Sequence, residues 1–233
     1  MKMRGQDAEL RASAIRALLA SPLLLRSRDD DMFRNVASLR GFLQSWFEDN
    51  LGWHLHVDVR AGIARLHKRA SRPDARRGIR STRASSRPFD AFRYQLLALI
   101  CAELLRRPHV TLGDLADAIT RICATDQDLR PLDIGLHSHR LALVDALLWL
   151  IEVGAVDVTA GEVDEFGRSR EIDAVLVADT TLIPMLLSSD VPPSRVGACD
   201  PAGWMDGLLS EPRYGDPENM DRDQRVRRSR PLA

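Results

Sequence analysis

Three short clusters of histidine and acidic residues have spacings that would suit metal binding, because imidazole and carboxylate groups are common metal ligands. Each cluster also has a plainer interpretation. Imidazoles can be exposed on a strand or at a helix start, and acids favour a helix N-terminus because of the helix dipole. We favour the plainer interpretation and expect no metal site and no cofactor. The clusters are His54 with His56, His137 with His139, and the run Asp29, Asp30 and Asp31.

Catalytic sequence patterns are missing from the chain. There is no GxxxxGK[ST] phosphate-binding loop, no GxSxG, no HExxH and no glycine-rich turn between a strand and a helix. The carboxylates are scattered along helix faces or gathered in one acidic segment. We therefore expect that the protein is not an enzyme, and we assign it no catalytic residue.

The cysteines are Cys101, Cys123 and Cys199, an odd number without a CxxC pair, so a zinc site is not expected. Cys101 and Cys123 lie in apolar helical patterns, which indicates small buried residues in a reducing compartment. The apolar run at residues 18–25 is interrupted by a Ser-Pro pair and predicts neither a signal peptide nor a membrane span. We expect a cytoplasmic protein with no membrane partner.

Lysine plus arginine equals aspartate plus glutamate at 33 each, which argues against a uniformly basic nucleic-acid binder but not against a local basic patch. Residues 67–88 form such a patch, in which Asp74 is the only acid. Serine, proline and glycine are frequent there, so we interpret the segment as a linker. Two interpretations stay open: a solvated connector, or a segment that contacts DNA phosphates. The candidate DNA-contact residues are Arg69, Arg72, Arg76, Arg77, Arg80 and Arg83.

The first half of the chain predicts helices followed by a hairpin. Residues 8–20 and 32–50 carry apolar residues at three- and four-residue spacing, which is typical of core-facing helices. Residues 53–59 alternate apolar and polar, a turn follows at Ala61-Gly62, and residues 63–68 return as a second strand. A helix followed by a tight hairpin is typical of the C-terminal half of a winged helix.

The second half predicts three helices and two strands in the order of a complete winged helix. The middle helix begins with a capping pattern, Thr111 followed three residues later by Asp114. The predicted helices are 92–105, 111–124 and 138–153, and the predicted strands are 155–160 and 172–178, with a polar, acidic loop at 161–170.

The expected fold class is α+β and mostly helical, with tandem winged-helix domains. We expect a first domain with an N-terminal helix at 8–68, the basic linker at 69–88 and a second domain at 89–190. Residues 191–233 are rich in proline and arginine, and we expect an extended or disordered tail there.

The third helix of the second domain is the one that would enter a DNA groove in a winged helix. It offers only Arg140 with His137 and His139, and then presents Asp145 and Glu152. The loop after it is acidic and would repel phosphate. We therefore expect a protein partner rather than a duplex at this surface. The candidate partner-binding residues are Glu162, Asp164 and Glu165.

Several short motifs follow one another along the chain in a fixed order. They are Arg16–Leu23, Trp46–Trp53 with Arg65–Lys68, Pro88-Phe89 with Arg93-Tyr94, Thr111–Ala116 and Gly154–Val156. Together they resemble the second subunit of type II Wadjet anti-plasmid systems, a subunit that is similar to MukE and other kite proteins. The resemblance covers roughly residues 11–195.

This resemblance implies a tandem winged-helix dimer that acts as a non-catalytic adaptor. Such a subunit would bind a kleisin-like chain and, through the complex, an SMC-like ATPase and a topoisomerase-VI-like nuclease. Complexes of that kind recognise and cleave circular plasmid DNA, so weak, nonspecific DNA contact is also implied. The family motifs supply no catalytic residue.

Two further expectations come from the residues themselves. The apolar density on 92–105 and 138–153 exceeds what one thin domain can cover, which predicts a homodimer. The alternative function is a free-standing winged-helix transcription regulator, which should carry a basic recognition helix. Residues 138–153 do not have that character.

Overall fold

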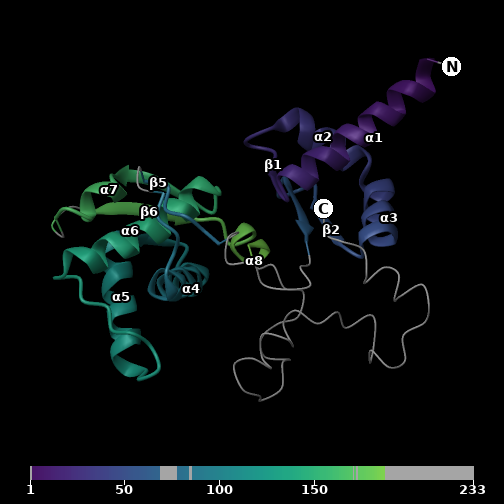
Figure 1. Cartoon of the computed structure of the whole chain (residues 1–233). Coiled ribbons are helices and arrows are strands. Elements are labelled where there is room, and N and C mark those ends of the chain that lie inside the picture. The colour runs from purple at the N-terminus through teal and green to yellow at the C-terminus, as the bar shows by residue number, and fades with distance from the viewer. Residues whose placement is uncertain (1, 69–77, 84–85, 170, 172, 187–233) are drawn as a thin grey trace, which may run out of the picture. The chain divides into compact units, whose positions relative to one another are not determined.

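The computed structural model describes residues 2–68, 78–83, 86–169, 171 and 173–186 (Figure 1). The predicted tail at 191–233 and much of the predicted linker lie outside the described residues. What is described falls into two compact units, one within residues 1–73 and one within 74–186. Each unit combines helices with one small antiparallel sheet, so the expected α+β class is confirmed. Among these residues, every helix is too short or too polar to span a bilayer.

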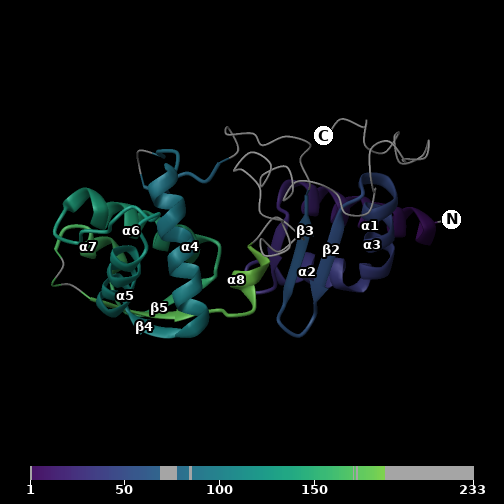
Figure 2. The same cartoon turned by 90° about the horizontal axis from the view of Figure 1, so that it is seen from below.

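The first unit places its helices against one face of a three-stranded sheet. The strand order is β1-β3-β2, and both pairings are antiparallel. In Figure 2, β2 and β3 lie side by side in front of the helices. The elements are α1 (Lys2–Ala20), β1 (Leu23–Leu25), α2 (Asp30–Ser38), α3 (Arg40–Leu51), β2 (His54–Asp58) and β3 (Ile63–His67).

The acidic run begins a helix, as expected. The carboxylate of Asp29 accepts the Met32 amide at 3.0 Å, and the next two acids occupy the first turn of α2. The single helix predicted at 32–50 is wrong, because the chain breaks at Leu39 into α2 and α3. Both helices contribute to the same core, so the apolar period continues across the break.

The hairpin of the first unit has the predicted turn. The Asp58 carboxylate accepts the amides of Arg60 and Ala61, each at 2.9 Å, and the hydrogen bond from Ala61 is the main reason that its pKa is lowered. Gly62 adopts φ 73°, a conformation that glycine accepts readily. The alternation of β2 buries Leu55 and packs the partly buried Val57 toward the helices, and it turns His54 and His56 to the other face.

The second unit repeats the element order of the first: helix, strand, helix, helix, strand, strand. Its sheet order, β4-β6-β5, again places the last strand in the centre. A short helix interrupts the final hairpin, and another follows it. The elements are α4 (Ala91–Arg106), β4 (His109–Thr111), α5 (Leu112–Thr125), α6 (His137–Glu152), β5 (Val156–Gly161), α7 (Val163–Phe166), β6 (Ala174–Ala178) and α8 (Leu182–Met185).

Local signals fix the ends of these helices. The Thr111 hydroxyl accepts the Asp114 amide at 3.1 Å and caps α5, as predicted. Asp90 caps α4 in the same way through the Arg93 amide. Gly154 follows α6 with φ 80°, a conformation typical of the glycine after a helix, and α6 ends within one residue of the predicted limit at 153. The sheet packs against α5 and α6, and α4 packs against both of these helices.

Candidate functional site

Asp145 of α6 is the centre of a buried polar cluster in the second unit. Its side chain is 5% exposed, although the sequence predicted an exposed residue on a groove-facing helix. One carboxylate oxygen accepts the Arg93 Nε–H at 2.8 Å, and the other accepts the Ser81 hydroxyl at 2.9 Å. The prediction for Asp145 is therefore wrong, because its neighbours on α6 are buried all round and its charge is balanced inside the unit.

Arg93 of α4 is the main residue that neutralises the charge of Asp145. Its side chain is 10% exposed, and its second nitrogen pairs with Asp90 at 2.9 Å, so the guanidinium lies between two carboxylates. Buried charges are retained only when they are paired and hydrogen-bonded. The Arg93–Asp145 pair therefore joins α4 to α6 through a directional hydrogen bond.

Arg83 joins the two groups of residues that the sequence assigned to different partners. Its Nε lies 3.3 Å from Asp145, and its terminal nitrogen donates to Asp164 at 2.9 Å. A candidate DNA-contact residue is therefore paired with a candidate partner-binding residue. Both ion pairs of the Arg83 guanidinium are formed within the second unit, and its side chain is only 28% exposed.

The rest of the basic segment is described only in part. Arg80 is exposed, forms an isolated bridge with Pro88 and donates to the Ser86 carbonyl at 3.0 Å. Ser81 is buried, and the Ile79 amide donates to the Tyr94 hydroxyl at 2.8 Å. The described end of the predicted linker therefore packs as part of the second unit. The other candidate DNA-contact residues, Arg69, Arg72, Arg76 and Arg77, lie outside the described residues.

The acidic loop between β5 and β6 contains helix α7, where the sequence predicted only a polar turn. Val163 and Phe166 are buried and hold α7 against α6. Their spacing of three residues was a helical signal, too short to detect beside so many acids. Glu162, which precedes α7, is exposed, and Glu165 on α7 is partly exposed and lies 3.9 Å from Arg168.

The acids near this loop have different roles. Asp173 accepts the Gly113 amide at 2.9 Å, at the N-terminus of α5, where the helix dipole favours a negative charge. Asp164 holds Arg83. That leaves Glu162 and Glu165 as the candidate partner-binding residues whose carboxylates are not hydrogen-bonded to another described residue.

The polar side chains at the start of α6 are also used within the unit. A ring nitrogen of His137 lies 2.8 Å from the Gly167 carbonyl, and His139 accepts the Asp133 amide at 3.0 Å. Arg140 donates to the carbonyls of Ile134 and Gly135 at 2.8 and 3.0 Å. The helix that a winged helix would place in a DNA groove thus begins with side chains that are already hydrogen-bonded.

A protein-family model described as a protein of unknown function, DUF2398, matches residues 15–233. The chain belongs to this family. A comparison with curated proteins finds no match. The match covers both units and the motifs noted above, apart from the first part of α1.

Cys101 and Cys123 of this DUF2398 protein have the environment of packing residues. Burial raises the pKa of the Cys101 thiol to about 11, and burial also raises the pKa of Cys123. A thiol with a raised pKa is protonated at neutral pH and is a poor nucleophile. Their interpretation as buried hydrophobic residues is confirmed for Cys123, while Cys101 is half-buried.

The outer face of the first sheet of the DUF2398 chain carries the second polar cluster. The rings of His54 and His67 stack at 6.2 Å, and His56 lies opposite Arg65 across the hairpin. Burial lowers the pKa of Arg65. Within the described ranges, no group of three or more histidine, cysteine or acidic residues is placed to hold a metal.

Proposed function

We propose that this protein is a non-catalytic, kite-type adaptor in an SMC-like Wadjet complex that defends against plasmid DNA. In this proposal the two units are winged-helix domains, the protein is a homodimer, and its main partner is a kleisin-like chain. Contact with DNA is weak and nonspecific.

The observation that carries the proposal is the state of helix α6. A winged-helix protein that reads DNA sequence presents free donors and cations on this helix. Here His137, His139 and Arg140 are hydrogen-bonded to backbone groups of the same unit. The adjoining loop is acidic, so phosphates would meet like charge. Both features favour a protein surface over a DNA-reading surface.

The repeated architecture supports the tandem winged-helix part. Both units have the order helix, strand, helix, helix, strand, strand, with the third strand between the other two. The motifs that resemble the Wadjet subunit occur in both units. An adaptor built this way needs no catalytic residue, because the resemblance assigns ATP hydrolysis and DNA cleavage to other chains of the complex.

The acidic loop is the surface that we assign to the kleisin-like chain. Glu162 and Glu165 face outward, while α7 is fixed by its buried side chains. Acidic side chains held on a rigid element suit a basic stretch of a partner, and rim charges of this kind act mainly on association rate and orientation. Asp164 contributes less in this proposal because it is bound to Arg83.

Co-purification with the kleisin-like product of a neighbouring gene tests the proposal. The full chain should form a stable complex, and the double variant Glu162→Lys with Glu165→Lys should associate about tenfold more slowly at low salt. The control variant Asp49→Lys with Asp128→Lys changes the net charge equally at exposed residues that are not part of the loop. Association of the control should be unchanged.

One result would favour the transcription regulator instead. If the protein selects one sequence from a random duplex pool with high affinity and does not bind the neighbouring gene product, the adaptor proposal is wrong. Equal association rates for the loop variant and its control would remove the acidic loop from the proposal but keep the adaptor role.

A further inference from the structure

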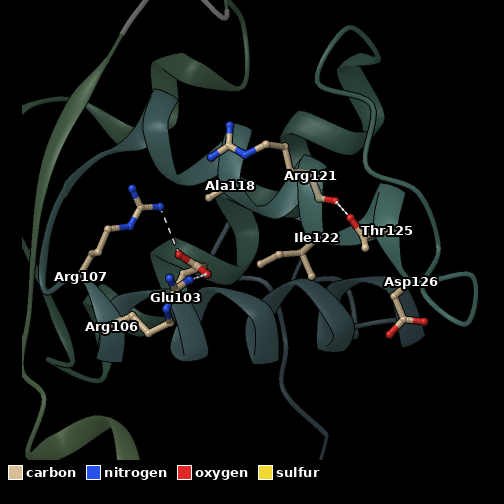
Figure 3. Close-up of a pocket in the computed structure, with 8 residues that line it drawn as sticks. All are labelled: Glu103, Arg106, Arg107, Ala118, Arg121, Ile122, Thr125 and Asp126. Atoms are coloured by element: carbon tan, nitrogen blue, oxygen red, sulfur yellow. Dashed lines mark hydrogen bonds and ion pairs between the residues drawn. The ribbon is translucent and has the colours of Figure 1, made fainter.

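A pocket of about 600 Å³ lies between α4 and α5 on the second unit (Figure 3). Residues three and four positions apart on each helix line it, so one face of each helix forms one wall. It is remote in sequence from the acidic loop, and its lining residues belong to none of the motifs noted above. The lining residues are Glu103, Arg106, Arg107, Ala118, Arg121, Ile122, Thr125 and Asp126.

The α4 wall is a prearranged pair of guanidinium groups. Glu103 has a side chain only 5% exposed, and it accepts Arg106 at 2.6 Å and Arg107 at 3.1 Å. A single carboxylate neutralises one of these two cations, so one positive charge remains. The arginine side chains are 72% and 43% exposed and stay accessible from the pocket.

Arg121 brings a third guanidinium from the opposite wall. It is exposed, and within the described part of the chain its side chain has no hydrogen bond or ion pair. Asp126 at the end of α5 offsets one charge, so the three arginines exceed the two carboxylates by one. A free guanidinium presents a fork of donors that matches a carboxylate with two parallel hydrogen bonds.

The pocket also has an aliphatic part. Ala118 is buried and Ile122 is half-buried, and both lie on the same face of α5 as Arg121. None of the lining side chains is aromatic, so nucleic-acid bases would find no stacking surface. The single excess positive charge of the pocket balances one carboxylate but not a run of phosphates. An aliphatic contact beside a guanidinium fits a peptide that carries an acidic and an apolar side chain.

We propose that the α4–α5 pocket binds a short segment of a protein partner in which a carboxylate side chain lies beside an aliphatic one. The carboxylate pairs with Arg121, Arg107 stabilises it by charge, and the aliphatic group packs on Ile122 and Ala118. This goes beyond the proposed function, which places a basic partner segment at the acidic loop. The pocket would serve a different segment of opposite charge, and its test does not depend on the kleisin.

A random displayed peptide library, selected against the full chain, provides the probe. Enriched peptides should combine aspartate or glutamate with leucine, isoleucine or valine. A synthetic peptide of the enriched sequence should bind the Arg121→Glu variant at least about tenfold more weakly, because a charge-assisted hydrogen bond is replaced by repulsion. Arg121 makes no bond within the described residues, so the variant should keep the wild-type circular dichroism spectrum.

The matched control is Arg40→Glu, which makes the same charge change at an exposed residue of the first unit. The peptide should bind this variant as it binds the wild type. Selection of no peptide, or of peptides that bind Arg121→Glu unchanged, would overturn the proposal. So would a loss of duplex DNA binding in Arg121→Glu that exceeds the loss in Arg40→Glu, because that result would assign the pocket to phosphate.

Discussion

Asp145 illustrates how one charged residue can fix the packing of a unit. Its carboxylate is surrounded by Arg93, Arg83 and Ser81, which come from α4 and from the segment that precedes it. Moving such ions out of water is costly, and their mutual attraction roughly offsets that cost when the geometry is good. We therefore expect the cluster to specify which surfaces meet more than it adds net stability. Removing one partner leaves the remaining buried charges with their desolvation cost but without the attraction that offset it.

We predict that Asp145→Ala lowers the free energy of unfolding by about 3 kcal/mol, because Arg93 would stay buried with only Asp90 as a partner. Urea denaturation followed by circular dichroism measures it. Asp157→Ala, at an exposed carboxylate, should change stability by no more than about 0.5 kcal/mol. The combined variant Asp145→Leu with Arg93→Met should lose less than Asp145→Ala. An equal loss would mean that the ion pair itself is net stabilising.

A second prediction concerns Cys101, whose pKa of about 11 in the fold lies above its usual 9.0. A raised thiol pKa means that the fold favours the protonated form, so this contribution is complete below pH 9 and is lost as the pH rises toward 11. We expect a loss of about 2 kcal/mol across that interval. The stability difference between wild type and Cys101→Ala should shrink by that amount over the same range. A difference independent of pH would contradict the prediction.

At the scale of elements, the sequence predicts long periodic segments well and short ones poorly. The helices α4, α5 and α6 begin and end within a residue or two of the predicted limits because caps and glycines mark them. The strands β1 and β4 were not predicted, because three residues are too few to show alternation. They become strands only by pairing with β3 and β6, which lie far along the chain.

The candidate site was predicted less well than the fold for a related reason. The sequence identified Arg83 as basic and Asp164 as acidic, but their pairing across 81 positions is a tertiary contact. A helical pattern also shows no difference between a carboxylate in solvent and one that meets an arginine on the next helix, as Asp145 does. The Arg93-Tyr94 motif could have indicated this site. The Arg93 side chain donates to Asp145, and the Tyr94 hydroxyl accepts the Ile79 amide of the segment at 78–83.

Two glycines give opposite predictions for the same substitution. Gly161 ends β5 with φ 78°, and a Cβ there would collide with the Asp173 carbonyl and lie 2.8 Å from the Ala174 Cα. Gly161→Ala should therefore destabilise by at least about 2 kcal/mol, since backbone must move. Gly41 lies in α3 with nothing within 4 Å of its Cβ position, so Gly41→Ala should stabilise by about 0.5 to 1 kcal/mol. Thermal unfolding of both variants measures the two signs.

At the scale of the whole molecule, the zero net charge hides strong local differences. The basic segment at 67–88 carries most of the local positive excess, while the loop at 161–170 is acidic. Arg83 belongs to the basic segment and pairs with Asp164 of the acidic loop, and its charge is neutralised by Asp145 and Asp164. We therefore expect electrostatic attraction to DNA to come from the other arginines of the segment rather than from Arg83.

The last prediction follows from that distribution. Binding to duplex DNA should be weak, independent of sequence and sensitive to salt, because each phosphate contact contributes about 0.9 to the slope of log K against log salt concentration. Replacing Arg72, Arg76, Arg77 and Arg80 with serine should flatten that slope by up to about 3.6.

A control with equal charge change replaces Arg28, Arg40, Arg60 and Arg168, all exposed outside the segment, and should leave more of the slope intact. Fluorescence anisotropy across a salt series measures both. Equal slopes for the two variants would show that the segment attracts DNA only through overall charge, and an unchanged slope in the first variant would make it a connector that DNA does not touch.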